Sequence, residues 1–254
     1  MRRVVVALAL MLALPSLPSL AAAQAAGKFP PDSLVNTKVF PHNTPVTQVL
    51  GAMRNFAGDL GVRCSYCHVE KEGQPLSQVD FPSDEKRTKR VARQMMLMVQ
   101  EINRRVDTLP ERVTTPTSLR VTCGTCHRGV TRPAPLAMVL TEVASTAGAD
   151  SAVRTYKALR TRYYGRSSYD FGEGSLTSAA LTLAQQKKFD EAFALLKLNE
   201  ENFPGSSPTA VTRGNVSLLR GDTAAAEAAF REAIKRDSTN QEAKGRLRAI
   251  GKQP

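Results

Sequence analysis

The chain has no tryptophan, three histidines and four cysteines among its 254 residues. After residue 24, no apolar run approaches the roughly 20 residues that a membrane-spanning helix needs. No helix-turn-helix, RNP or zinc-finger pattern accompanies the formal charge of +12, so this charge does not indicate nucleic-acid binding. An acidic protein partner or an anionic membrane surface fits the basic balance better.

The first residues of the chain have the pattern of a secretory signal peptide. Arg2 and Arg3 form a basic start, an apolar run covers residues 4–14, and small residues lead to Ala23. An uncleaved membrane anchor is the alternative, but two prolines break the segment and the run is too short to span a bilayer. We therefore expect residues 1–23 to be removed on export, which places the mature protein in the periplasm.

All four cysteines belong to two copies of the pattern Cys-x-x-Cys-His. The residues of this pattern are Cys64, Cys67 and His68, and then Cys123, Cys126 and His127. Two thiols three residues apart on a helical turn match the two vinyl groups of one haem, with which they can form thioethers. The histidine that follows then presents its imidazole to the iron. The pattern predicts two covalently attached c-type haems.

Paired cysteines have three other common uses. Two disulfides would suit an exported chain, but they do not require a histidine after each pair. A zinc site built from two such pairs usually separates them by about 15 to 20 residues, and the gap here is far longer. A thioredoxin-like redox motif follows a strand and would rarely occur twice. Two of the three histidines stand where haem attachment requires them, which favours haem.

The sixth ligand of an electron-carrying haem iron is usually Met or His, so methionines on apolar helix faces are candidates. Residues 44–61 are predicted to form a helix, with Thr44 as N-cap, Pro45 at the first position and Gly61 just past the end. Met53 lies on the apolar stripe of this helix. Ordinary core packing is the other interpretation of a methionine in such a stripe.

A second helix is expected over residues 84–106, opened by Ser83. Met95 and Met98 are neighbours on its apolar face, and either could reach an iron. Each haem motif is therefore preceded by a helix that carries a methionine on its apolar stripe. His42 is the only spare histidine, and we interpret it as a loop residue.

Three stretches within residues 35–136 resemble the cytochrome subunit family of bacterial photosynthetic reaction centres: MRNFAGDLGVRCSYCH, KRVARQMMLMVQEIN and VTCGTCHRGVTRP. The resemblance implies, for each haem, a helix with an axial methionine, a turn and the attachment motif on a second helix. It pairs Met53 with His68, and Met95 with His127, with Met98 as the rival of Met95. Reaction-centre cytochromes of this kind usually hold four haems and are often lipid-anchored, whereas this chain has two motifs and no lipidation cysteine.

The last third of the chain contains neither cysteine nor histidine and shows an internal period of 34 residues. This period matches tetratricopeptide repeats, in which small residues let two helices of a pair approach closely. A basic helix is expected around residues 153–164, then two repeats at 173–206 and 207–240, and then a polar capping helix at 241–250. The array can serve either as a partner-binding groove or as a helical cover for the cytochrome.

The expected fold is all-α. Its expected parts are the signal peptide 1–23, a dihaem cytochrome domain 24–140, a linker with a basic helix 141–172, and the tetratricopeptide-like repeats 173–254. The expected function is electron transfer in the periplasm, without catalysis of a substrate reaction. The alternatives are a haem enzyme such as a dihaem peroxidase, and a haem-bearing scaffold or sensor.

The expected partners are redox proteins, which include a membrane-bound reaction centre or a respiratory complex. Peripheral association with the inner membrane fits the basic charge. We expect no nucleic-acid partner.

Overall fold

The computed structural model describes residues 28–108 and 120–254. These ranges contain helices and turns but no β-strand, and one isolated β-bridge pairs Val69 with Asp80. The all-α fold that the sequence predicts is confirmed. The predicted signal peptide, residues 1–23, lies outside the described residues.

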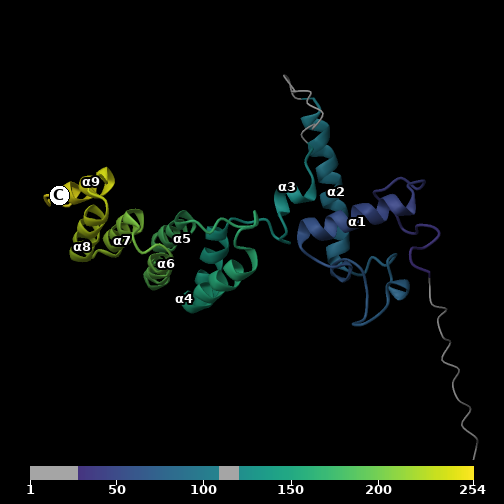
Figure 1. Ribbon diagram of the computed structural model, residues 1–254, viewed down its shortest axis with the longest axis horizontal. Coiled ribbons are helices and arrows are strands. Elements are labelled where there is room, and N and C mark those ends of the chain that lie inside the picture. The colour runs from purple at the N-terminus through teal and green to yellow at the C-terminus, as the bar shows by residue number, and fades with distance from the viewer. Residues whose placement is uncertain (1–27, 109–119) are drawn as a thin grey trace, which may run out of the picture.

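The elements of the first part of the chain gather at one end of the molecule, and the later helices extend away from them (Figure 1). The elements of this first part are α1 (Val46–Leu60), η1 (Cys64–Tyr66), η2 (Leu76–Gln78), α2 (Arg87–Val106) and α3 (Cys123–His127). Both haem motifs therefore form short helical turns, and each follows one of the two longer helices.

Helix α1 ends as predicted and begins slightly later than predicted. Gly61 has φ 66° and ψ 35°, a left-handed C-cap, and its N–H bonds to carbonyls of the last turn. Thr44 is not the N-cap, because its hydroxyl donates to the carbonyl of Pro41 at 2.7 Å, in the preceding turn. Pro45 occupies the N-cap position without a side-chain hydrogen bond.

Helix α2 begins at Arg87 and not at residue 84. The backbone carbonyls of residues 81–85 accept hydrogen bonds from two cationic side chains that reach back from the helix, Lys89 and Arg90. Ser83 accepts a bond from the N–H of Glu85, so it closes a local turn and does not open the helix. Side-chain bonds thus replace the backbone bonds that an earlier helix start requires.

The remaining helices are α4 (Leu136–Tyr163), α5 (Glu173–Gln185), α6 (Phe189–Asn202), α7 (Ser207–Arg220), α8 (Thr223–Arg236) and α9 (Gln241–Ala249). Equivalent helices start 34 residues apart, since α5 begins at Glu173 and α7 at Ser207. The predicted capping helix is present as α9. The predicted basic helix is the second half of α4, a longer helix that Gly148 kinks with φ 80° and ψ 175°.

The apolar core lies in these later helices. One cluster joins α4, α5 and α6, and a second joins α7, α8 and α9. A Cβ atom on Gly214 would lie 2.3 Å from the ring of Phe230, so only glycine lets α7 and α8 cross this closely. The segment 141–172, expected to be a linker with a basic helix, contributes Ala144, Ala152 and Tyr156 to the first cluster.

The first part of the chain has little core of its own. Within residues 28–108, Val49 and Val79 are the buried apolar residues, at 6% and 7% exposure. No helix in the described ranges combines the length and apolar composition needed to cross a bilayer.

Candidate haem sites

The first motif is a single helical turn anchored to the start of α2. The N–H of His68 donates to the carbonyl of Cys64 at 2.9 Å, which closes the turn around the two thiols. Lys86 donates to the carbonyl of Ser65, and Thr88 donates to the carbonyl of Tyr66. The turn is therefore held by side chains from the first residues of α2.

The second motif is anchored to the other end of α2. Asn103 donates from its amide to the carbonyl of Val121 at 2.9 Å, and it accepts from the N–H of Val121 at 2.9 Å. Thr122 and Thr125 form a capping box that starts α3. Between Thr88 and Asn103 the helix rises by about 22 Å. Helix α2 therefore holds the two motifs apart, with one motif at each of its ends.

Helix α1 also supports the second motif. The N–H of Gly129 donates to the carbonyl of Asp59 at 2.8 Å. A Cβ atom on Gly61 would lie 2.2 Å from the carbonyl oxygen of Gly129, and one on Gly124 would lie 2.6 Å from the Asp59 carboxylate. These close approaches make the end of α1 and the second motif one packed unit.

Each motif histidine uses Nδ1 for a bond to a backbone carbonyl. The distance is 3.2 Å from His68 Nδ1 to the Phe81 oxygen, and 2.8 Å from His127 Nδ1 to the Val130 oxygen. An Nδ1–H that donates to a carbonyl fixes the tautomer and leaves the Nε2 lone pair free for a metal. The two histidines therefore share the arrangement that iron ligation requires.

Electrostatics also favour the neutral form of His68. Burial lowers the pKa of His68, and the positive charges of Lys89, Arg93 and Lys86 lower it further. Burial raises the pKa of the Cys67 thiol, against the opposing effect of Lys86. At neutral pH the first motif thus presents an unprotonated imidazole.

The methionine-bearing helices expose apolar faces. Helix α2 has no buried residue, and its Met95 and Met98 are 37% and 48% exposed. Val91 on the same face is 38% exposed. Met53 of α1 is half-buried, as is Met96 of α2, which the sequence pattern did not single out. Apolar faces that the chain leaves uncovered suit an apolar ring such as haem.

The four cysteines are free, so neither pair forms the disulfide that the sequence left open. Among the described residues, no three or more His, Cys, Asp or Glu side chains gather where they could hold a metal ion. His42 is exposed in the turn before α1. The donors present, two thiols and one directed imidazole beside an apolar helix face, fit a covalently attached haem at each motif.

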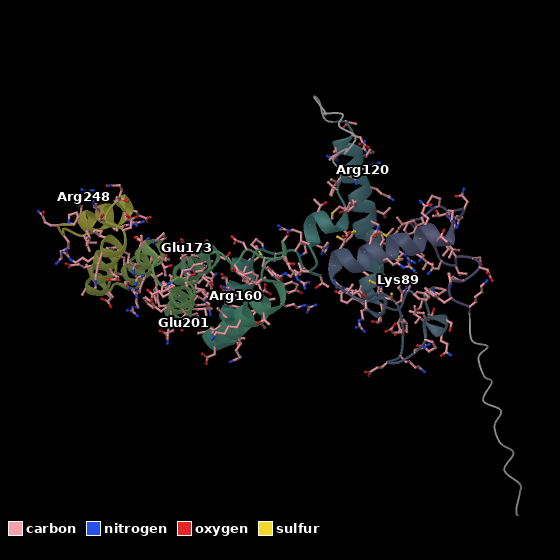
Figure 2. The ribbon with its side chains drawn as sticks, in the orientation of Figure 1. Lys89, Arg120, Arg160, Glu173, Glu201 and Arg248 are labelled. Atoms are coloured by element: carbon pink, nitrogen blue, oxygen red, sulfur yellow. The ribbon has the colours of Figure 1, made fainter. Side chains whose placement is uncertain are left out.

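A cluster of cations lies around the first motif, and the sequence pattern did not predict it. Lys89 and Arg93 are only 12% and 14% exposed, and both pair with Asp84. Lys89 is labelled in Figure 2, at the end of α2 that holds the first motif. The signal in the sequence was a run of five basic residues between positions 86 and 93. Such charges are unfavourable at a helix N-terminus unless they have other partners.

A family model described as the photosynthetic reaction centre cytochrome C subunit matches residues 11–172. The matched region contains both motifs and helices α1 to α4, and it ends one residue before α5. No curated protein matches the chain.

Proposed function

Because the chain belongs to the photosynthetic reaction centre cytochrome c subunit family, we propose that it is a periplasmic electron carrier with two covalently attached haems. The description of this family implies covalently attached c-type haem and a redox partner in a membrane complex. The observation that carries the proposal is the repeated histidine geometry, in which each Nδ1 is bound to a carbonyl and each Nε2 remains available.

The residues divide into two haem-binding sets. The first set is Cys64 and Cys67 for the thioethers, His68 as the proximal ligand and Met53 as the sixth ligand. The second set is Cys123 and Cys126 for the thioethers, His127 as the proximal ligand and Met95 as the sixth ligand, with Met98 as its rival. A bound haem supplies reversible one-electron chemistry at iron, and a thioether ligand raises its potential.

The protein's own contribution is to orient the two histidine ligands and to hold the two motifs apart. The carbonyls of Phe81 and Val130 hold the two imidazoles, and α2 fixes the separation of the two motifs. Met53 and Met95 would close the sixth position of the two irons, which an enzyme such as a peroxidase needs to keep open. We therefore favour the carrier over the haem enzyme.

The proposed partners are redox proteins, including a membrane-bound reaction centre or a respiratory complex. The formal charge of +12 supports an acidic partner or peripheral contact with an anionic membrane. Export through the signal peptide at residues 1–23 accounts for the periplasmic location and for access to haem attachment.

We assign residues 24–140 to the dihaem domain, 141–172 to a connecting segment with the basic helix, and 173–254 to tetratricopeptide-like repeats. The 34-residue spacing of α5 with α7 and the tight crossing at Gly214 support the repeat assignment. The array would either bind a partner or cover the cytochrome. A pull-down that compares the full-length protein with a variant lacking residues 173–254 separates these roles, because only a partner-binding array loses a captured protein on deletion.

Carbon monoxide binding tests the carrier function. The reduced protein, produced with a cytochrome c maturation system, should show low-spin spectra at both haems and no rapid change on exposure to carbon monoxide. Rapid binding at one haem would favour the enzyme or a sensor, and rapid binding at both would overturn the proposed methionine ligation.

A further inference from the structure

The second half of α4 carries basic side chains on the side that points away from the core. Ala152, Tyr156 and Tyr163 are buried on its inner side, where the helix packs against α5 and α6. Because one turn takes 3.6 residues, Arg154 lies opposite these three residues. The exposed residues on this outer side are Arg154, Lys157, Ala158, Thr161 and Arg162.

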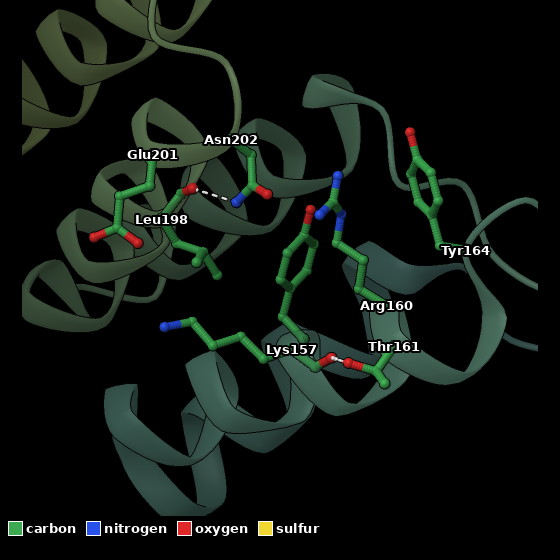
Figure 3. A pocket seen from close by; sticks show the side chains of 8 residues that line it. Lys157, Arg160, Thr161, Tyr164, Leu198, Glu201 and Asn202 are labelled. Atoms are coloured by element: carbon green, nitrogen blue, oxygen red, sulfur yellow. Dashed lines mark hydrogen bonds between the residues drawn. The ribbon is translucent and has the colours of Figure 1, made fainter.

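Two further cations extend this group. The N–H of Arg166 donates to the carbonyl of Tyr163 at 2.9 Å, which keeps Arg166 beside the last turn of the helix. Arg160 is half-buried, and its guanidinium carbon lies 4.5 Å from the centre of the Tyr164 ring. In Figure 3, Lys157, Arg160 and Tyr164 follow one another along this end of α4. The basic surface of α4 consists of Arg154, Lys157, Arg160, Arg162 and Arg166.

The cations of the basic surface have no carboxylate partners. None of the five forms an ion pair in the described ranges, either with Asp150 on the same helix or with Glu201 on α6, which Figure 3 also shows. In the repeats, by contrast, Arg231 and Arg246 each pair with a glutamate four residues earlier. Neighbouring cations without partners repel one another, and an anionic partner would relieve this repulsion.

The composition of the basic surface favours a membrane over a protein as this partner. The centre of a protein interface is rich in apolar and aromatic side chains and poor in charges, whereas the outer side of α4 exposes no large apolar side chain between its cations. Clustered Lys and Arg on a helix suit the mobile phosphates of an anionic bilayer. Tyr164, at the end of the surface, is 65% exposed, and tyrosine rings favour the headgroup level of membranes.

The basic surface is also joined to the second haem motif. Ser168, two residues after Arg166, donates to the carbonyl of Arg128 at 2.6 Å. Arg128 directly follows His127 in the chain. A partner that holds the basic surface therefore lies on the side of the molecule that carries the second motif.

We propose that the basic surface of α4 binds membranes that contain anionic phospholipids, with its cations at the lipid phosphates and the Tyr164 ring among the headgroups. This inference rests on the peripheral membrane contact given under the proposed function and assigns that contact to particular residues. The attraction is electrostatic, so it weakens as salt screens the charges.

Co-sedimentation of the full-length haem-loaded protein with phospholipid vesicles tests the site. Vesicles that contain phosphatidylglycerol should bind the protein saturably, and the binding should weaken as the ionic strength rises. Vesicles of phosphatidylcholine alone should not bind it. Equal binding to both kinds of vesicle, or no binding to the anionic vesicles, would overturn the proposal. Binding of soluble polyglutamate without binding of anionic vesicles would also overturn it and would assign the surface to an acidic protein.

A double variant tests whether α4 provides the binding surface. Arg154→Gln with Arg162→Gln removes two exposed cations of the basic surface, and Arg231→Gln with Arg246→Gln removes the same charge from the exposed sides of α8 and α9. At roughly 1 kcal/mol for each cation near an anionic membrane, the α4 variant should bind about thirtyfold more weakly. The control should bind like the wild type, and equal losses in the two variants would contradict the assignment to α4.

The haem spectra separate a failure of this site from a failure of the proposed electron-carrier function. All four substituted side chains are exposed, so both double variants should fold and keep the wild-type spectra. Loss of vesicle binding with unchanged spectra then concerns the surface alone.

A fluorescent side chain locates the contact directly, because the chain has no tryptophan. The emission of Tyr164→Trp should shift to shorter wavelength with anionic vesicles. Leu219→Trp, at a 52% exposed position on α7, should show no shift. A shift at position 219 without one at position 164 would place the contact on the repeats and overturn the proposal.

Discussion

Lys89 and His68 meet at one backbone carbonyl: the Lys89 Nζ lies 2.7 Å, and the His68 Nδ1 3.2 Å, from the oxygen of Phe81. In the second motif, His127 Nδ1 lies closer to its own acceptor, the Val130 oxygen, at 2.8 Å. An ammonium on the shared oxygen weakens the imidazole hydrogen bond and adds a positive charge nearby. Both effects make His68 a poorer electron donor to a bound metal than His127.

Replacing Lys89 with Gln should therefore lower the potential of the haem at the first motif. Because the Lys89 side chain is 12% exposed, its charge is poorly screened. With an effective dielectric of about 20, the shift should be on the order of 50 mV. Spectroelectrochemical titration measures both haems at once, and Lys197→Gln, an exposed lysine on α6, is the control. Equal shifts of both haems would show that Lys89 does not act on His68 specifically.

Substitution of the axial methionines should change one haem at a time. Met53→Leu should lower the potential of the first haem by on the order of 100 mV, within the roughly 0.8 V range that axial ligands control, and should open that haem to carbon monoxide. Met95→Leu should do the same at the second haem, and Met98→Leu should leave both low-spin. If Met98→Leu gives the change and Met95→Leu does not, the ligand is Met98.

Substitution by alanine at Gly61 and at Gly58, both at the end of α1, should change the free energy of unfolding in opposite directions. Gly61 has φ 66°, and a Cβ there would lie 2.2 Å from the Gly129 carbonyl oxygen, so Gly61→Ala should destabilise the protein by about 2 kcal/mol or more. Gly58, in the helix with nothing within 4 Å of its Cβ position, should gain up to about 1 kcal/mol as alanine. Urea unfolding measures both, and similar effects would contradict the packing of α1 on the second motif.

Asn103 should matter for stability through its paired bonds to Val121. Asn103→Ala leaves the Val121 backbone groups without these partners and should cost about 1–3 kcal/mol. Asn55→Ala, an exposed residue of α1, should change the free energy of unfolding by no more than about 0.5 kcal/mol. Equal stability of the two variants would mean that α2 does not hold the second motif.

The sequence predicts what depends on short-range chemistry. The two motifs, the helices before them, the Gly61 cap and the capping helix α9 all follow from residue types at fixed spacing. It misplaces the start of α2, because Lys89 and Arg90 take the carbonyls of residues 81–85, a set of contacts that no propensity encodes. It also misses the first half of α4, whose small residues look like a linker but pack on α5 and α6.

The hydrogen-bond partners and cations around His68 could not be predicted for the same reason. The Phe81 carbonyl is 13 residues from His68, so the bond between them depends on the path of the loop that joins η1 to α2. In the sequence, only the five basic residues between positions 86 and 93 indicate that cations lie near His68.

The mass of the intact protein, measured together with a pyridine haemochrome spectrum after expression with a maturation system, tests the central claim most directly. We predict two covalent haems per chain in the wild type. The double variant Cys64→Ser, Cys67→Ser should carry one covalent haem. A chain without covalent haem would contradict the cytochrome assignment of both motifs.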